Sequence, residues 1–152
     1  MKKLKLFLML FVCLSTMCLS TACSNDDDEG QISDPASMIA GTYVGKGQLE
    51  MVGLSGMPIE EYQGMKIYVT KSSNEFVILT PYSADGSPFF SSGSGDVFQI
   101  TQTVNGDYLL TSTNIPNARV SITKSKDLSY YYPYVSVGGE SGYALSFTGK
   151  KQ

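Results

Sequence analysis

The chain has 152 residues, a formal net charge of −3, and neither histidine nor tryptophan. Without histidine it cannot form a Ser-His-Asp or Cys-His catalytic centre, or a zinc or iron site built on imidazole. It shows no basic patch, so we expect no nucleic-acid partner. Carboxylate chemistry stays open, but these absences favour a protein that binds rather than catalyses, with no metal and no cofactor.

The first 22 residues have the layout of an export signal. Three lysines, Lys2, Lys3 and Lys5, precede an apolar run from Leu6 to Leu14, and small and hydroxyl residues follow. A membrane-spanning helix needs ~20 apolar residues, and this run is too short for one. We therefore predict that residues 1–22 are a signal peptide rather than a membrane anchor or a core helix.

The stretch Leu19-Ser20-Thr21-Ala22-Cys23 resembles a bacterial lipobox. It departs from the usual pattern because Ser20 takes the place of the leucine, which stands one residue earlier. The resemblance implies cleavage before Cys23, followed by acylation of its thiol and of the new amine. Several acyl chains give stable attachment, since each buried CH₂ contributes ~0.8 kcal/mol. Cys23 is therefore the expected contact with the membrane.

Residues 23–34 are expected to form a lipidated, acidic and flexible tether. The run from Asp26 to Glu29 cannot bury apolar surface and should stay solvated. It resembles the acidic signal that directs some Gram-negative lipoproteins to the outer face of the outer membrane. A plain tether facing the periplasm and a weak calcium site are the alternatives. The expected location is the outer membrane, with the protein lipid-anchored and exposed at the cell surface.

Residues 35–152 are expected to fold as one domain without a disulfide. Cys13 and Cys18 leave with the signal and Cys23 is acylated, so an ordinary apolar core must stabilise the body. Asp34 and Pro35 have the residue types of a helix cap and a first helical position, which predicts one helical turn ending before Gly41.

Hydrophobic alternation with period two predicts strands after this turn. They are expected over residues 43–51, 65–70, 76–79, 98–104, 108–110, 118–123, 130–137 and 143–148. Asn105-Gly106 predicts a hairpin with a type I′ turn, and Pro133 predicts a strand that is broken or lies at an edge. Gly45 and Gly47 both face inward, which indicates a sharp bend or room left for something inside. The other inward side chains are expected to be Leu49, Met51, Met65, Ile67, Val69, Phe98, Ile100, Leu110, Val120, Ile122, Leu145 and Phe147.

Eight strands joined mainly by short connections predict an all-β, eight-stranded antiparallel up-and-down barrel. A two-layer β-sandwich is the alternative. Residues 36–149 resemble the calycin-like, lipocalin-like barrels of bacterial lipoproteins, most specifically from Ile39 to Gly45. The resemblance implies that Tyr43 replaces the tryptophan that plugs the closed end, that Lys150 is its basic partner, and that the barrel binds a small apolar molecule.

The carboxylates of the body provide no catalytic pair. Four aspartates lie in or beside turns, where aspartate is expected for turn reasons alone. These are Asp85, Asp96, Asp107 and Asp127. Glu60 and Glu61 are neighbours, and in an extended segment their side chains point to opposite faces. They are therefore a poor pair for glycoside hydrolysis, in which two carboxylates converge on one bond.

Aromatic residues are the candidate contacts. Phe89 and Phe90 lie in a long loop from Pro81 to Gly95, where they either pack over the barrel end or form the lip of a site. Tyrosines cluster near the predicted seventh strand, as Tyr130, Tyr131, Tyr132 and Tyr134. Alternation places Tyr131 on one face of that strand and the other three on the opposite face. The tyrosines either fill the core or serve a site.

Two functions remain open at this stage. In the first, the barrel binds a small, largely apolar ligand in its interior, which in an eight-stranded barrel either holds one small molecule or is filled by side chains. In the second, surface tyrosines dock a glycan or another envelope protein, because tyrosine offers a flat apolar face and a hydroxyl. The sequence does not identify the ligand, the partner or the oligomeric state.

Overall fold

The computed structural model describes residues 34–51, 58–90, 93–112, 114–135 and 142–152. These residues form a short helix followed by eight strands. The helix is α2 (Pro35–Ile39), and the strands are β1 (Gly41–Met51), β2 (Pro58–Lys71), β3 (Phe76–Tyr82), β4 (Asp96–Gln102), β5 (Tyr108–Thr111), β6 (Arg119–Ile122), β7 (Asp127–Val135) and β8 (Gly142–Lys151). No helix in these described ranges has the length and apolarity to cross a bilayer. The predicted signal peptide, Cys23 and the acidic run lie outside them.

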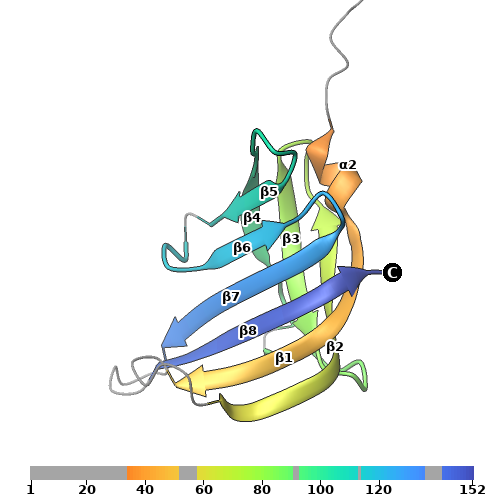
Figure 1. The fold of residues 1–152 in the computed structure, drawn as a ribbon. Coiled ribbons are helices and arrows are strands. Elements are labelled where there is room, and N and C mark those ends of the chain that lie inside the picture. The colour runs from red at the N-terminus through yellow and green to blue at the C-terminus, as the bar shows by residue number, and fades with distance from the viewer. Residues whose placement is uncertain (1–33, 52–57, 91–92, 113, 136–141) are drawn as a thin grey trace, which may run out of the picture. The chain divides into compact units, whose positions relative to one another are not determined.

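The eight strands close into an antiparallel up-and-down barrel. Each strand pairs with the next along the chain, and β8 returns to pair with β1 from Tyr143 opposite Met51 to Lys151 opposite Tyr43. Figure 1 shows β7, β8 and β1 running side by side in this closing wall. The predicted barrel is confirmed and the β-sandwich alternative is wrong. Short connections explain the result, because consecutive strands pair directly and closure satisfies both edges of the sheet.

The interior is the apolar cluster that strand alternation predicts. Ten of the twelve predicted inward side chains are buried, while Leu49 and Met51 at the end of β1 are half-buried. The prediction omitted several members of this cluster. These are Val77, Leu79, Tyr108, Leu128 and Tyr130.

A bulge in β2 explains an error in its predicted extent. Residues 58–64 lie between the predicted strands, but they belong to β2, and residues 58–63 pair with β1. Gly64 adopts a φ of 68°, and the register shifts there, so Met65 lies opposite Gly45 while Gln63 lies opposite Lys46. The extra residue of a bulge reverses the phase of the alternation. Tyr62 and Met65 therefore face the interior although their spacing is odd.

The two inward glycines of β1 allow close packing and leave no empty space. Gly45 lies opposite Gly149 of β8, and a Cβ at Gly45 would sit 2.0 Å from the carbonyl oxygen of Thr148. A Cβ at Gly47 would sit 2.3 Å from the sulfur of Met65. Neighbouring atoms occupy the space beside both glycines, which contradicts the expected room for something inside. The sharp bend stays a prediction.

The turn at Asn105-Gly106 joins β4 and β5, but it is not a type I′ turn. That turn requires a positive φ at both central residues, and here Gly106 alone has one, at 84°. The turn spans Thr103 to Asp107, with a 2.8 Å hydrogen bond from the Thr103 N–H to the Asp107 carbonyl. The β6–β7 turn from Thr123 to Asp127 repeats this pattern, with Lys126 at a φ of 66°.

Pro133 lies at a local edge, as predicted. The pairing of β6 with β7 ends at Arg119 opposite Tyr131. Beyond Tyr131, β7 pairs with β8 alone, and Pro133 lies opposite Ala144. Proline lacks the N–H that a central strand would donate to a second neighbour. The strand continues through Pro133 because no such neighbour is paired there.

Candidate ligand site at the open end of the barrel

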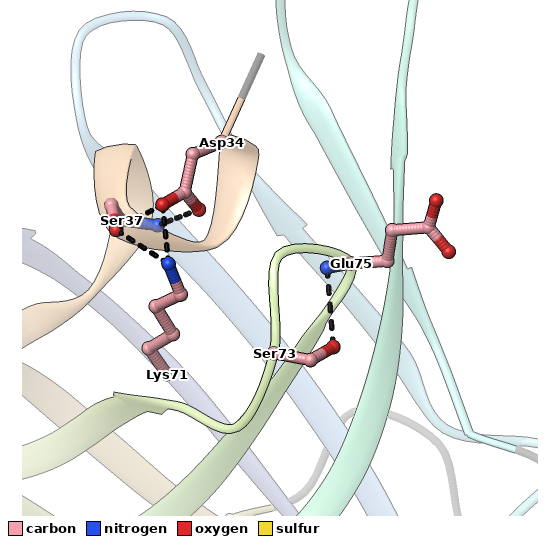
Figure 2. A network of polar contacts seen from close by, with 5 residues as sticks. All are labelled: Asp34, Ser37, Lys71, Ser73 and Glu75. Atoms are coloured by element: carbon pink, nitrogen blue, oxygen red, sulfur yellow. Dashed lines mark hydrogen bonds and ion pairs between the residues drawn. The ribbon is translucent and has the colours of Figure 1, made fainter. Parts of the chain in front are cut away.

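Helix α2 closes one end of the barrel. Asp34 caps the helix by accepting hydrogen bonds from the Ser37 N–H at 3.0 Å and the Ser37 hydroxyl at 2.6 Å. Lys71 at the end of β2 forms an ion pair with Asp34 and donates to the Ser37 Oγ at 3.1 Å. Figure 2 shows this network beside the adjacent turn, where the Glu75 N–H donates to the Ser73 Oγ. These contacts tie the helix to the β2–β3 end of the wall.

Tyr43 lies fully buried beneath α2. Its hydroxyl donates a 2.8 Å hydrogen bond to the Ile39 carbonyl, and burial, followed by the influence of Tyr108, raises the Tyr43 pKa to about 12. The neighbouring Met38 carbonyl accepts from Lys126 at 3.0 Å and from Lys151 at 3.3 Å.

The prediction that Lys150 is the basic partner of Tyr43 is wrong by one residue. Its side chain points outward, 79% exposed, and pairs with Asp127 at 3.4 Å. Lys151, the next residue, takes the position at the helix. The error follows from the alternation of the strand, in which a shift of one residue reverses the face.

Topology places the longer connections at the opposite end. The turn after β2 meets α2 through Asn74, the start of β5 meets it through Tyr108, and the turn after β6 meets it through Lys126. In an up-and-down barrel the connections after β1, β3, β5 and β7 must then lie at the other end, which we call the open end. Of these connections, the one after β3 is the longest.

The β3–β4 loop folds back onto the end of β3. Pro88 forms a bridge with Tyr82, and the Phe89 N–H donates to the Pro81 carbonyl at 3.0 Å. The loop is braced further by Asp85, which accepts from both the N–H and the hydroxyl of Ser87. This fold-back directs Phe89 and Phe90 toward the barrel interior.

Five aromatic rings form a continuous cluster at the open end, which we call the aromatic cluster. It runs in the order Tyr62, Phe89, Phe90, Tyr132 and Tyr130. Successive ring centroids are 5.1, 5.3, 5.2 and 5.8 Å apart, and the last pair is stacked with planes 6° apart. Tyr130 is buried, whereas the other four are partly exposed and pack against the interior. The cluster therefore links the apolar interior to the surface.

The structure separates the predicted tyrosines. Tyr130 and Tyr132 join Phe89 and Phe90 in the aromatic cluster. Tyr131 faces the outer wall, with Arg119 on one side and Ser146 on the other in the strand register. Tyr134 is paired with Tyr143 through the backbone of β7, but its side chain lies outside the described residues.

Asp96 brings a carboxylate to this site. It is the first residue of β4 and lies opposite the buried Leu79, on the same face as Phe98 and Ile100. Tyr132 is hydrogen-bonded to Asp96. Burial, then this hydrogen bond and the negative charge of Asp96, raise the Tyr132 pKa far above its usual value. Burial, then Tyr132 and Asp96, raise the pKa of Tyr130 in the same direction. Both phenols therefore remain neutral at physiological pH.

A second carboxylate lies at the other end of the aromatic cluster. Glu60 accepts a 2.7 Å hydrogen bond from the Tyr62 hydroxyl and lies opposite Leu49. Glu61 faces the outer wall, where it contacts Lys46 at 3.4 Å and Gln48 at 3.1 Å. The predicted divergence of the two glutamates is confirmed.

Two members of this site were missed in the sequence. Asp96 was interpreted as a turn residue, although the alternation of Phe98 and Ile100 extends back to it. Gly95 fixes its position, because a Cβ there would lie 2.6 Å from the Leu79 carbonyl oxygen and only glycine allows that approach. Tyr62 gave no usable signal, since the bulge at Gly64 breaks the alternation.

The outer wall carries a separate open groove of about 440 Å³ across β6, β7, β8 and β1. Hydroxyl groups line much of it, and Asp127 and Lys150 stand at one end. The hydroxyl residues are Ser121, Thr123, Ser129 and Thr148. The surface of the groove is nevertheless mainly apolar, so the hydroxyls supply hydrogen-bonding groups at the edges of an apolar floor.

The barrel is similar to the crystal structure of a "putative outer membrane protein" from Bacteroides fragilis, with a TM-score of 0.55 and 16% sequence identity. The match covers 78% of this chain and 53% of the Bacteroides chain, so this chain spans about half of that protein's length. EF1p2_mFAP2b bound to DFHBI is also similar, with a TM-score of 0.35, 16% identity, and coverage of 80% and 99%. At these identities the likeness concerns the fold alone. No protein-family model and no curated protein matches the chain.

Proposed function

We propose that the chain is an outer-membrane lipoprotein whose barrel binds a small, largely apolar molecule at its open end, without enzymatic activity. The observation that carries the proposal is the aromatic cluster. Four of its rings remain partly exposed at the end of the barrel that α2 leaves uncovered. Ligand sites are typically lined by apolar and aromatic side chains with a few convergent polar groups. Here Asp96 and the tyrosine hydroxyls are those polar groups.

The anchor and location rest on the sequence. The lipobox-like residues before Cys23 support acylation, and the acidic run from Asp26 to Glu29 supports display at the outer membrane. The Bacteroides protein of similar fold carries an outer-membrane description, but the comparison concerns its fold.

Fluorine NMR tests binding at the predicted rings. The full chain, labelled with 3-fluorotyrosine and held in phosphatidylcholine nanodiscs, is titrated with 2-naphthalenemethanol, a neutral apolar probe. Resonances are assigned by single Tyr→Phe substitutions. We expect saturable shifts of Tyr130 and Tyr132 and no shift of Tyr131, because Tyr131 is adjacent in sequence but faces the outer wall.

Site-specific readout separates binding from partition into lipid. A probe that merely dissolves in the nanodisc produces no saturable, residue-selective shift. If the Tyr131 resonance moves as much as that of Tyr132, or if none moves, the open end is not the binding site and the proposal is wrong.

The outer-wall groove supports docking of a glycan as a second candidate function. Tyr131 projects from β7 on the same face as Ser129, which lines the groove, so a ring for stacking on a sugar lies beside hydrogen-bonding hydroxyls. Of the predicted surface tyrosines with described side chains, Tyr131 is the one on this wall. A glycan array probed with the wild type and with Tyr131→Ala tests this, and equal signals from both proteins would exclude it.

A further inference from the structure

Basic residues are absent from the inner face of the open end. Between Pro35 and Gln152 the chain has eight lysines and arginines, and all of them are described. Four lie at the end that α2 closes: Lys71, Lys124, Lys126 and Lys151. The other four alternate with inward residues of their strands and face the outer wall: Lys46, Lys66, Arg119 and Lys150.

Acidic residues, by contrast, occupy the inner face at both ends of the aromatic cluster. Asp96 lies beside Tyr130 and Tyr132, and Glu60 beside Tyr62. Each of these carboxylates is hydrogen-bonded to a tyrosine of the cluster, so its position is fixed relative to the ring faces. A carboxylate has about four lone-pair sites, and one hydroxyl donor leaves the others available.

Ring faces and carboxylates attract the same kind of group. The face of an aromatic ring carries a negative quadrupole and attracts cations positioned within about 6 Å. A carboxylate attracts the same charge, and the attraction strengthens where water is partly excluded. Because no base opposes them on this face, Asp96 and Glu60 leave the mouth with a negative potential. An anionic ligand would meet two uncompensated carboxylates there.

We propose that the ligand of the open end is an organic cation, an ammonium group carried on an apolar or aromatic body. This rests on the proposed function. Asp96 faces the charge, and the rings of Phe90 and Tyr132 contact the apolar body. Asp96 is thus a specificity-determining residue, which selects cations over neutral and anionic molecules of the same shape.

Three probes with the same naphthalene body test the charge preference. They are (2-naphthylmethyl)trimethylammonium, 2-naphthalenemethanol and 2-naphthylacetate. Each is titrated into the full chain in phosphatidylcholine nanodiscs, and affinity is read from the Tyr132 fluorine resonance. We expect the cation to bind about tenfold more tightly than the alcohol, because the Asp96 carboxylate attracts its charge at a place where water is partly excluded. The anion should bind least.

Substitution then assigns the preference to one residue. Asp96→Asn should remove the preference for the cation over the alcohol. Glu61→Gln is the matched control, because Glu61 lies one residue from Glu60 but faces the outer wall. It should keep the tenfold preference.

The outcomes separate the inference from the proposed function. Equal affinities for the three probes, or tightest binding of the anion, overturn the cation proposal and leave an apolar site in place. Absence of binding by all three overturns both. If circular dichroism shows that Asp96→Asn does not fold, the relative affinities of the wild type for the three probes still test the proposal. Raising the salt concentration should weaken binding of the cation and leave binding of the alcohol unchanged. An identical effect of salt on both probes contradicts the proposal.

Discussion

The hydroxyl of Tyr43 donates a 2.8 Å hydrogen bond to the carbonyl oxygen of Ile39, joining the first strand of the barrel to the helix that precedes it. Both residues are fully buried, so neither group has ready access to water. The contact fixes α2 over one end of the barrel and leaves the other end to the loops. It acts together with the contacts that Lys71, Lys126 and Lys151 make with the same helix.

Tyr43→Phe should lower the free energy of unfolding by about 1–2 kcal/mol, because it leaves a buried carbonyl without this donor. Urea denaturation monitored by circular dichroism measures the loss. Tyr68→Phe is the control, since Tyr68 lies on the outer wall with 38% of its surface exposed and should change stability by less than about 0.5 kcal/mol. Equal stabilities of the two variants would contradict this role for Tyr43.

The Asp34 carboxylate should make the stability of the barrel depend on pH in the acidic range. Its hydrogen bonds to Lys71 and then to Ser37 lower its pKa from 3.8 to about 2. A depressed carboxyl pKa stabilises the folded state above the unfolded value, and this contribution is lost as the pH falls from near 4 through about 2. Asp34→Asn should therefore flatten this part of the pH dependence, measured as the thermal midpoint at a series of pH values.

Ser73→Ala is the matched control for Asp34. It removes a hydrogen bond from the adjacent turn, drawn in Figure 2, but it removes no titratable group. It should shift the midpoint by a similar amount at every pH. A Ser73→Ala protein that loses the acid dependence, or an Asp34→Asn protein that keeps it, would show that the Asp34–Lys71 pair is not its source.

Alanine should be tolerated very differently at two glycines of β1. At Gly45 the new Cβ would meet backbone atoms of β8, which cannot move without disturbing the closing pair of strands. We expect Gly45→Ala to destabilise the barrel by about 3 kcal/mol or more. At Gly47 the obstacle is the flexible Met65 side chain, so Gly47→Ala should cost about 1 kcal/mol. Urea denaturation compares them, and a larger loss at Gly47 would be inconsistent with this packing.

Cys23 should be the acylated residue. Cys23→Ala should abolish incorporation of labelled palmitate and release the protein from the membrane fraction of a Gram-negative host. Cys18→Ala, which changes the other cysteine near the predicted cleavage point, should do neither. Intact-protein mass spectrometry checks both. Acylation that survives Cys23→Ala would invalidate the predicted anchor.

The barrel could be predicted because alternation is a local signal. Polar residues alternate with Met65, Ile67 and Val69, and this alternation is enough to predict that these three side chains face the interior. The same is true of Leu145 and Phe147. A closed sheet follows from many such segments joined by short turns. The parts that were wrong depend on single-residue insertions. The bulge at Gly64 hid Tyr62, and one position separates Lys150 from Lys151.

The candidate site could be predicted only in part from the sequence, for a different reason. Tyrosine and phenylalanine stand out by composition, but their meeting depends on the β3–β4 loop folding back through the bridge between Pro88 and Tyr82. No periodicity encodes that bridge. Asp96 was assigned to a turn because glycine and serine precede it, although β4 begins at Asp96 itself. Its inward direction emerges only from its pairing with Leu79.

The position of Pro133 has a consequence for self-association. Where β7 loses its pairing with β6, an exposed strand could recruit a strand from another molecule, which is how edge-to-edge aggregates start. The pyrrolidine ring withholds the amide hydrogen that an incoming strand would need at that point. The unpaired end of β7 is thus a poor template for a second chain. We infer that this proline disfavours edge-to-edge association of the barrel.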